Sequence, residues 1–394
     1  MRSNLRLATL VRSRRDDEGS MLLALVTVIL ITGIVMALLT VVLEGQKSTR
    51  HDLRYTDDAQ VSDAGVQQAY FAINNLPKTD TTTMSLSSGG AQTIGDGTYT
   101  WTATRSSTNL LSWTVTSKGT TTSGAGLAAT RTVVSQVNQS PLFSLAAFAN
   151  STITFNGNNA AVSYPTPGYG VVGTNGSLTL KGSSTTVDGI TLYDWANDPN
   201  TSRCTGQGCP AASATSTVAD PLPLQDATSS SGFITQQLNV CKAAGPLTAF
   251  VGTSIAASDT PYCFSSFWAD TDNFTVTGDP TKSAIVYVDG GDVTMGDKNH
   301  SDVNNDVPGQ PTSIRLQVYT TGTTVNMYNQ GQISAAIYAP NAACSGAGSN
   351  AQTDFYGSIY CDTIANVGGW TFHYDTRLAN IGDGKWMIKH YSEP

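Results

Sequence analysis

The sequence predicts a mainly β protein that begins with one long helix, and three observations lead to this prediction. The first is an uncharged apolar run from Met21 to Leu43. The second is a series of short alternating segments separated by turns rich in glycine, serine, threonine and asparagine. The third is that only 13% of the 394 residues are charged, about half the usual share of roughly 25%. Threonine favours strands, whereas glycine and asparagine accept the backbone conformations of tight turns.

The N-terminal region predicts a single membrane-spanning helix behind a basic leader. Residues 1–15 contain five arginines, and Met21–Leu43 contains no charged residue. At about 1.5 Å per residue, a helix of this length crosses a hydrocarbon core of about 30 Å. The basic flank favours a cytoplasmic N-terminus, so the rest of the chain is expected outside the cytoplasm. A buried helix of a soluble protein is the alternative interpretation.

The helix is expected to continue beyond the membrane. Residues from Glu44 to Leu76 are rich in helix formers and contain no proline, and Pro77 disfavours helix at the residue before it. We therefore expect one helix over residues 20–76, with its membrane span over residues 21–43. Its packing stripe is expected at steps of three or four residues, at Leu53, Val61, Ala64, Gln68, Phe71 and Asn75.

This region resembles the type IV prepilins. A basic leader, Met1–Gly19, precedes an apolar helix that becomes amphipathic, and Val61–Gly65 (VSDAG) is similar to the family's A-x-E-A-G segment. The resemblance extends to minor pilins of the PilX type and covers about residues 14–76. It implies cleavage by a prepilin peptidase between Gly19 and Ser20. It also implies helix packing with other pilin-like subunits, and a sheet against the upper half of the helix.

One departure from the family leaves two functions open. Most major pilins have a glutamate at the fifth mature position, which is Ala24 in this sequence. The protein is expected to be either a minor pilin or pseudopilin that joins or caps a filament, or an uncleaved single-span, adhesin-like anchor. In both cases it is a membrane protein with its β-rich part outside the cytoplasm.

Residues 77–140 predict a small antiparallel β-sheet domain. Three alternating segments, Gly97–Arg105, Leu111–Gly119 and Ala129–Val137, are separated by turn residues. The expected packing residues are Tyr99, Trp101, Trp113, Val115 and Val133.

Residues 141–394 predict a β-solenoid, similar to a right-handed β-helix, with a β-sandwich as the alternative. The segment Ile337–Asp375 resembles a domain of PilX-type and other bacterial surface proteins. A proline- and serine-rich insertion is expected at residues 197–232. Strands followed by glycine-containing turns are expected within Ser151–Gly157, Gly176–Gly182, Asn273–Gly278, Gly291–Gly296 and Thr323–Gly331.

All six cysteines follow the predicted membrane span, so an oxidising compartment and three disulfides are expected. Six cysteines allow 15 pairings, and proximity in the sequence favours Cys204–Cys209, Cys241–Cys263 and Cys344–Cys361. A zinc site is disfavoured because no C-x-x-C occurs.

One segment has oxygen ligands that suit Ca²⁺, at Asp297, Asn299, Asp302, Asn304 and Asp306. It lacks the glycine and glutamate of an EF-hand, so solvated turn residues are the favoured interpretation, and no cofactor is expected.

The remaining chemistry argues against catalysis and against nucleic-acid binding. None of the four histidines lies in H-E-x-x-H, and neither a G-x-S-x-G segment nor a P-loop occurs. We therefore expect no enzymatic activity; a β-helix enzyme acting on glycans, with paired carboxylates, is the competing hypothesis. The net charge of −8 opposes binding to phosphate backbones.

Overall fold

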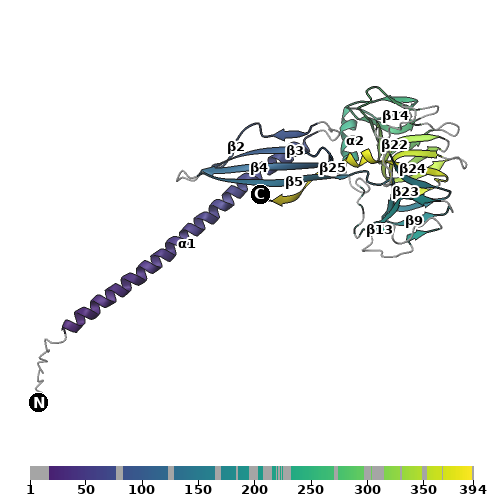
Figure 1. Ribbon diagram of the computed structural model, residues 1–394. Helices are drawn as coiled ribbons and strands as arrows, with labels where there is room; N and C mark the ends of the chain where they lie inside the picture. Colours follow the sequence, from purple (N-terminus) through teal and green to yellow (C-terminus); the bar gives the residue numbers. More distant parts are fainter. Residues whose placement is uncertain are drawn as a thin grey trace, which may run out of the picture.

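The computed structural model consists of a long helix, an antiparallel sheet and a larger parallel β-domain (Figure 1). It describes residues 17–76, 83–122, 128–164, 170–182, 185–194, 203–206, 215–218, 220, 222, 224, 232–269, 274–296, 303, 315–328, 331–347, 353–365 and 367–392. The mainly β fold with one long N-terminal helix agrees with the sequence prediction.

Helix α1 (Asp17–Asn74) is continuous over 58 residues, close to the predicted range. Its first half projects away from every other element, and its second half lies against the antiparallel sheet (Figure 1). The sheet has the order β1-β3-β4-β5-β25, with β2 paired to β3. Its strands are β1 (Ser85–Ser87), β2 (Gln92–Ile94), β3 (Gly97–Arg105), β4 (Ser112–Thr122), β5 (Ala128–Pro141) and β25 (Gly382–Ser392). The predicted meander of three strands is confirmed as β3, β4 and β5.

The last strand lies in a different part of the fold from the one the sequence suggested. Its residues were expected to belong to the solenoid-like region, residues 141–394. In the structure β25 pairs antiparallel with β5, and Gly382 faces Pro141. The intervening residues, 142–381, therefore form an insertion between two neighbouring strands of the sheet.

The face of α1 that packs on the sheet differs from the predicted stripe. Its members are buried and follow helical steps, at Asp58, Val61, Ser62, Gly65, Val66, Ala69 and Ile73. Of the predicted stripe, Phe71 is 64% exposed, and Gln68 and Asn75 are also exposed. Val61 of the predicted stripe is buried in this contact and Ala64 packs against it, and the side chain of Leu53 lies outside the described residues. The other members were wrong because the contact includes the small residues Ser62, Gly65 and Ala69, which the predicted stripe did not include.

These small residues allow the helix and sheet backbones to approach closely. A Cβ added to Gly119 of β4 would lie 2.7 Å from the backbone nitrogen of Ser62. A Cβ added to Gly65 would lie 2.1 Å from Ser117 Oγ. The apolar core lies next to this contact, and all five predicted packing residues of the sheet are buried in it, namely Tyr99, Trp101, Trp113, Val115 and Val133.

The larger domain is a parallel β structure formed by strands β6 to β14, β16 and β18 to β24, with β15 and β17 as a separate parallel pair. Its first strands are β6 (Ala147–Phe155), β7 (Ala160–Tyr164), β8 (Val171–Thr174), β9 (Ser177–Leu180), β10 (Thr186–Val187), β11 (Gly189–Leu192), β12 (Cys204–Thr205) and β13 (Thr215–Thr217). After helix α2 (Phe233–Ala244) come β14 (Thr248–Gly252), β15 (Ser254–Ala256), β16 (Tyr262–Ala269), β17 (Thr275–Thr277), β18 (Ala284–Val288), β19 (Val293–Met295), β20 (Leu316–Thr320), β21 (Thr324–Tyr328), β22 (Gln332–Ala347), β23 (Thr353–Ala365), β24 (Trp370–Asp375) and the 3₁₀-helix η4 (Thr376–Asn380).

The chain path places the first strands of this domain between its last strands and the strands that follow β6 and β7. Strand β6 pairs with β8 and β9, which follow it, and also with β23 from near the end of the domain. Strand β24 pairs with β7 in the same way. All these pairings are parallel, which is compatible with a β-helix-like fold. The five segments predicted as strands are strands, as β6, β9, β17, β19 and β21, whereas α2 was not predicted.

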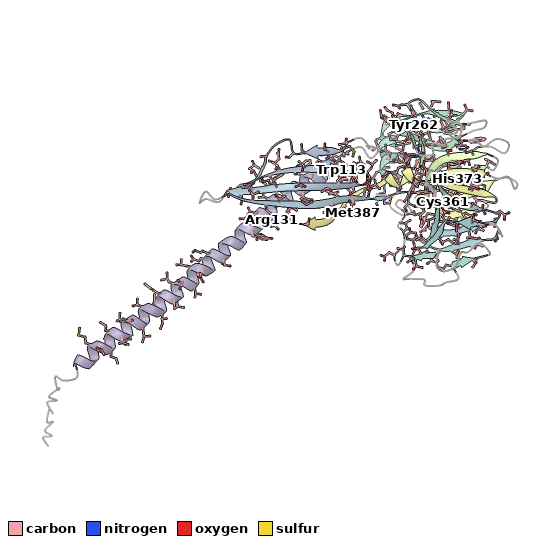
Figure 2. All side chains as sticks on the ribbon, viewed as in Figure 1. Trp113, Arg131, Tyr262, Cys361, His373 and Met387 are labelled. Atoms are coloured by element: carbon pink, nitrogen blue, oxygen red, sulfur yellow. A yellow bond between two sulfur atoms is a disulfide. The ribbon has the colours of Figure 1, made fainter. Side chains whose placement is uncertain are left out.

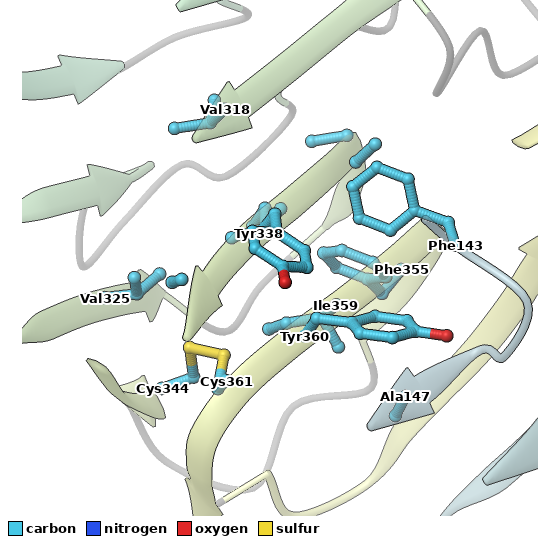
Figure 3. Close-up of a cluster of buried hydrophobic side chains, with 14 of the residues drawn as sticks. Phe143, Ala147, Val318, Val325, Tyr338, Cys344, Phe355, Ile359, Tyr360 and Cys361 are labelled. Carbon is cyan, nitrogen blue, oxygen red and sulfur yellow. A yellow bond between two sulfur atoms is a disulfide. The ribbon is translucent and has the colours of Figure 1, made fainter. Parts of the chain in front are cut away.

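Two disulfides join neighbouring parts of the domain, and both match pairings expected from proximity. Cys241–Cys263 ties α2 to β16, and Cys344–Cys361 ties β22 to β23 (Figure 3). Cys204 is also disulfide-bonded, and Cys209 lies outside the described residues.

A column of tyrosines joins the parallel domain to the chain that enters it. Tyr287, Tyr319, Tyr338 and Tyr360 occupy one register position on successive strands. The ring of Phe143 packs against Tyr338 and Tyr360 (Figure 3). The Tyr360 hydroxyl accepts hydrogen bonds from the backbone N–H groups of Ser144 (2.9 Å) and Leu145 (3.1 Å). Burial raises the pKa of Tyr360 far above its usual value, so this hydroxyl stays protonated.

The close approach of α1 to β4 predicts that Gly119→Ala destabilises the protein. The added methyl group meets the backbone of Ser62, which cannot rotate away, so we expect a loss of about 1–3 kcal/mol in the free energy of unfolding. Denaturant unfolding of the full chain in detergent measures this loss. Gly90→Ala is the matched control, because nothing lies within 4 Å of its added Cβ. Equal stability of the two variants would contradict the close contact.

The column of tyrosines predicts that Tyr360→Phe destabilises the protein, because two backbone N–H groups lose their acceptor. The expected cost is about 1–3 kcal/mol. Tyr262→Phe serves as control, since its hydroxyl bonds the exposed carbonyl of Ala256, and a change within about 0.5 kcal/mol is expected there. The same unfolding measurement applies, and a neutral Tyr360→Phe variant would refute the assigned role.

Candidate functional site: the exposed apolar half of helix α1

The most unusual surface of the molecule is the first half of helix α1. Within the segment Met21–Thr49, none of the most apolar stretch is buried. Its side chains extend from the helix into open space (Figure 2), and Met21 and Leu22 are 77% and 72% exposed. An apolar surface of this size requires a lipid bilayer or other apolar helices around it.

Polar groups within this half are satisfied by the helix itself. The hydroxyl groups of Thr27, Thr32 and Thr40 donate to the backbone carbonyl groups four residues earlier, at 2.7, 2.6 and 3.0 Å. A hydroxyl group that is bonded to its own helix costs less to place in an apolar environment. The threonines are therefore compatible with burial of this surface in lipid or among helices.

The predicted processing site lies at the beginning of the helix. Gly19 and Ser20 follow the first helical residue, Asp17, within the first turn. Ala24, which stands where many pilins have a glutamate, is exposed on the free half of the helix. No acidic residue occurs between Gly19 and Leu43, so the whole surface of this segment is free of negative charge.

Three contacts fix the direction in which the free half leaves the sheet. The Arg131 guanidinium group lies 4.3 Å from the Tyr55 ring centre and donates to the Tyr55 carbonyl. The Thr121 hydroxyl donates to the Asp58 carboxylate, which is buried. Further along the helix, the Tyr70 hydroxyl donates to the carbonyl of Trp386 in β25 (2.9 Å). Contacts from β4, β5 and β25 therefore hold the second half of α1.

The other candidate sites are not assembled by the described part of the chain. The five residues of the calcium candidate, Asp297, Asn299, Asp302, Asn304 and Asp306, lie outside it. Among the described residues, no three His, Cys, Asp or Glu side chains converge on a common point. His373 lies on the outer surface, where its ring stacks on Tyr356 at 4.2 Å and its Nε2 is 3.0 Å from Asp354 Oδ1.

The small residues that position the helix were not among the predicted packing residues. Ser62, Gly65 and Ala69 are buried against the sheet, and they recur at steps of three and four. A search for small residues at helical spacing opposite a strand glycine would have found them. The predicted VSDAG segment contains two of them, so it marks the contact with the sheet.

Comparisons with known proteins give little further guidance. A family model described as a domain of unknown function (DUF7305) matches residues 265–381, which is less than half of the chain. No curated protein matches the sequence. A solved structure, the competence-associated pilin ComZ from Thermus thermophilus, is 10% identical; the match covers 86% of this chain and 97% of ComZ, at a TM-score of 0.30. A TM-score this low carries no argument, so the chain's own geometry must support any proposed function.

Proposed function

We propose that this protein is a minor pilin or pseudopilin. In this function α1 first anchors the chain in the membrane and then packs among the apolar helices of other pilin-like subunits. The parallel β-domain is displayed outside the cell, as part of a type IV pilus-like filament or as its cap. No catalytic step belongs to this function.

The observation that carries the proposal is the division of helix α1 into two halves. The second half is covered by a dedicated antiparallel sheet, and the first half is fully exposed and apolar. An anchor that stays in lipid needs only the apolar segment. A rigid continuation of the same helix, clamped by a sheet, also fixes the angle at which the apolar half meets neighbouring helices.

The dimensions of the helix fit both environments. At roughly 1.5 Å per residue, the 29 residues of Met21–Thr49 extend about 44 Å, which is enough to cross the hydrocarbon core with residues to spare. The basic leader favours a cytoplasmic N-terminus. In Figure 1 the parallel domain lies at the end of the sheet opposite the free helix, so it would point away from the membrane.

A second candidate function is a permanently anchored, adhesin-like surface protein. The observation in its favour is Ala24, which replaces the acidic residue that many pilins present near the helix N-terminus. In this case the prepilin peptidase is not a partner, and the leader stays attached.

Leader cleavage separates the two functions. We expect the membrane-extracted protein to begin at Ser20 when the prepilin peptidase is present and at Met1 when it is absent. Intact-mass measurement of the protein from both strains detects the loss of residues 1–19. We also expect Gly19→Val to abolish cleavage, because the resemblance to prepilins places the cut directly after this glycine.

The matched control is Gly45→Val, a glycine of the same helix that has open space around it. This variant should be cleaved like the natural chain. A start at Met1 in both strains would exclude the pilin function and leave the uncleaved anchor.

A further inference from the structure

One outer face of the parallel domain is a regular array of uncharged side chains. It is formed by β19, β21, the last parts of β22, β23 and β6, and by β9 and β12. Each of these segments pairs in parallel with the next one. The array therefore runs across strands on both sides of β6, and all of these strands run in the same direction.

Along each strand, successive side chains point alternately into the core and onto this face. The inward residues are buried, for example Val293, Val325 and Leu178. The outward residues at one register position are Thr294, Asn326 and Ser345 on one side of β23 and Thr154, Thr179 and Thr205 on the other. In β23 itself this position is Ala365, which pairs with Ser345, so the hydroxyl and amide groups leave a gap of one strand. Neighbouring strands are about 4.8 Å apart, so these groups form a column with that repeat.

Hydrogen bonds between side chains order this column. The hydroxyl oxygens of Thr179 and Thr205 are 3.2 Å apart, and the Ser345 hydroxyl donates to Asn326 Oδ1 at 3.4 Å. Side chains held in this way lose less conformational entropy when a ligand binds.

The face carries no charge although the whole chain has a net charge of −8. The segments paired across this face contain no charged residue, namely residues 293–295, 324–328, 343–347, 363–365, 152–155, 177–180 and 204–205. Asp362 of β23 lies directly before them, and its carboxylate accepts hydrogen bonds from the side chains of Asn150 and Ser151. A neutral surface on an acidic protein offers no attraction to an anionic polymer. Its regular donors and acceptors instead match a ligand that is itself neutral and rich in hydroxyl groups.

An exposed aromatic ring continues the column at one end. Trp268 pairs with Thr294 on one side and with Val251 on the other, and it is 42% exposed. A flat indole ring beside hydroxyl groups can stack on the apolar face of a pyranose ring. Tyr328 of β21 lies on the same side of its strand as Asn326 and is partly exposed, so a second aromatic ring lies beside the column.

We propose that this face binds a neutral polysaccharide, with its chains lying along the column of hydroxyl groups and one sugar ring stacked on Trp268. The strand repeat is close to the length of one pyranose residue, so successive sugars can meet successive strands. The proposal concerns the parallel domain alone. Its failure would leave the pilin function and the leader test unaffected.

Binding is tested with the full-length protein in detergent. Microcrystalline cellulose and chitin are the neutral probes, and gelled polygalacturonate is the acidic probe; the bound fraction is measured after centrifugation. We expect the natural chain to be recovered in the pellet with at least one neutral probe. With the acidic probe, the protein should remain in the supernatant. The variant Thr154→Lys/Asn326→Lys should lose at least about tenfold in affinity, because it places two charges against a neutral ligand.

The matched control is Thr186→Lys/Thr371→Lys, which adds the same charge to strands β10 and β24, outside the array. It should bind like the natural chain. Circular dichroism establishes whether both variants fold. If the variant with the two array lysines does not fold, Trp268→Ala provides the test, and it should also lose binding. The proposal is overturned if the natural chain binds neither neutral probe or if Trp268→Ala binds unchanged. If the protein itself sediments differently in the variant with the array lysines, but not in the control variant, the face is instead a contact between copies of this chain.

Discussion

The close approach of helix α1 to strand β4 determines how the rest of the molecule is arranged. At Gly119 the strand offers no side chain, so the backbone of Ser62 can lie directly against it. Gly65 and Ala69 continue this contact along the helix, and the ring systems of Tyr99 and Trp113 fill the space beside it. A helix held by its backbone in this way cannot roll on the sheet. Its apolar continuation therefore leaves the sheet in one fixed direction, as an assembly surface requires.

The second constraint is the position of β5 and β25. Because these strands are neighbours, residues 142–381 enter and leave the sheet at the same place, with Pro141 facing Gly382. The last strands of the parallel domain return to its first strands, with β23 paired to β6 and β24 paired to β7. The entering chain is then held by Tyr360, which binds the backbone of Ser144 and Leu145. The domain is thus attached through two adjacent strands, at the end of the sheet opposite the free helix (Figure 1).

Much of this architecture follows from the sequence because it depends on local patterns. Hydropathy and length predict α1, and the alternation of side-chain character along the sequence predicts β3 and several strands of the parallel domain. The proximity of the cysteines in the sequence predicts the disulfides Cys241–Cys263 and Cys344–Cys361. The missed features depend on distant partners. The pairing of β25 with β5 joins residues more than two hundred positions apart, and nothing local in β25 distinguishes it from a further coil. The packing face of α1 was predicted only in part, at Val61 and Ala64, because Gly65 and Ser62 carry no hydrophobic signal. The array of hydroxyl groups becomes visible only when the register aligns Thr294 with Asn326, and Thr154 with Thr179.

The claim that the free half of α1 packs among like helices is tested most directly on filaments sheared from cells. A cysteine placed at Leu38, on the exposed apolar surface, would be cross-linked in the sheared fraction and the products identified by mass spectrometry. Assembly predicts that the chain is recovered in this fraction, cross-linked through position 38 to the apolar helix of another pilin-like subunit. Recovery of the chain only in the membrane fraction, with no such cross-link, would contradict it.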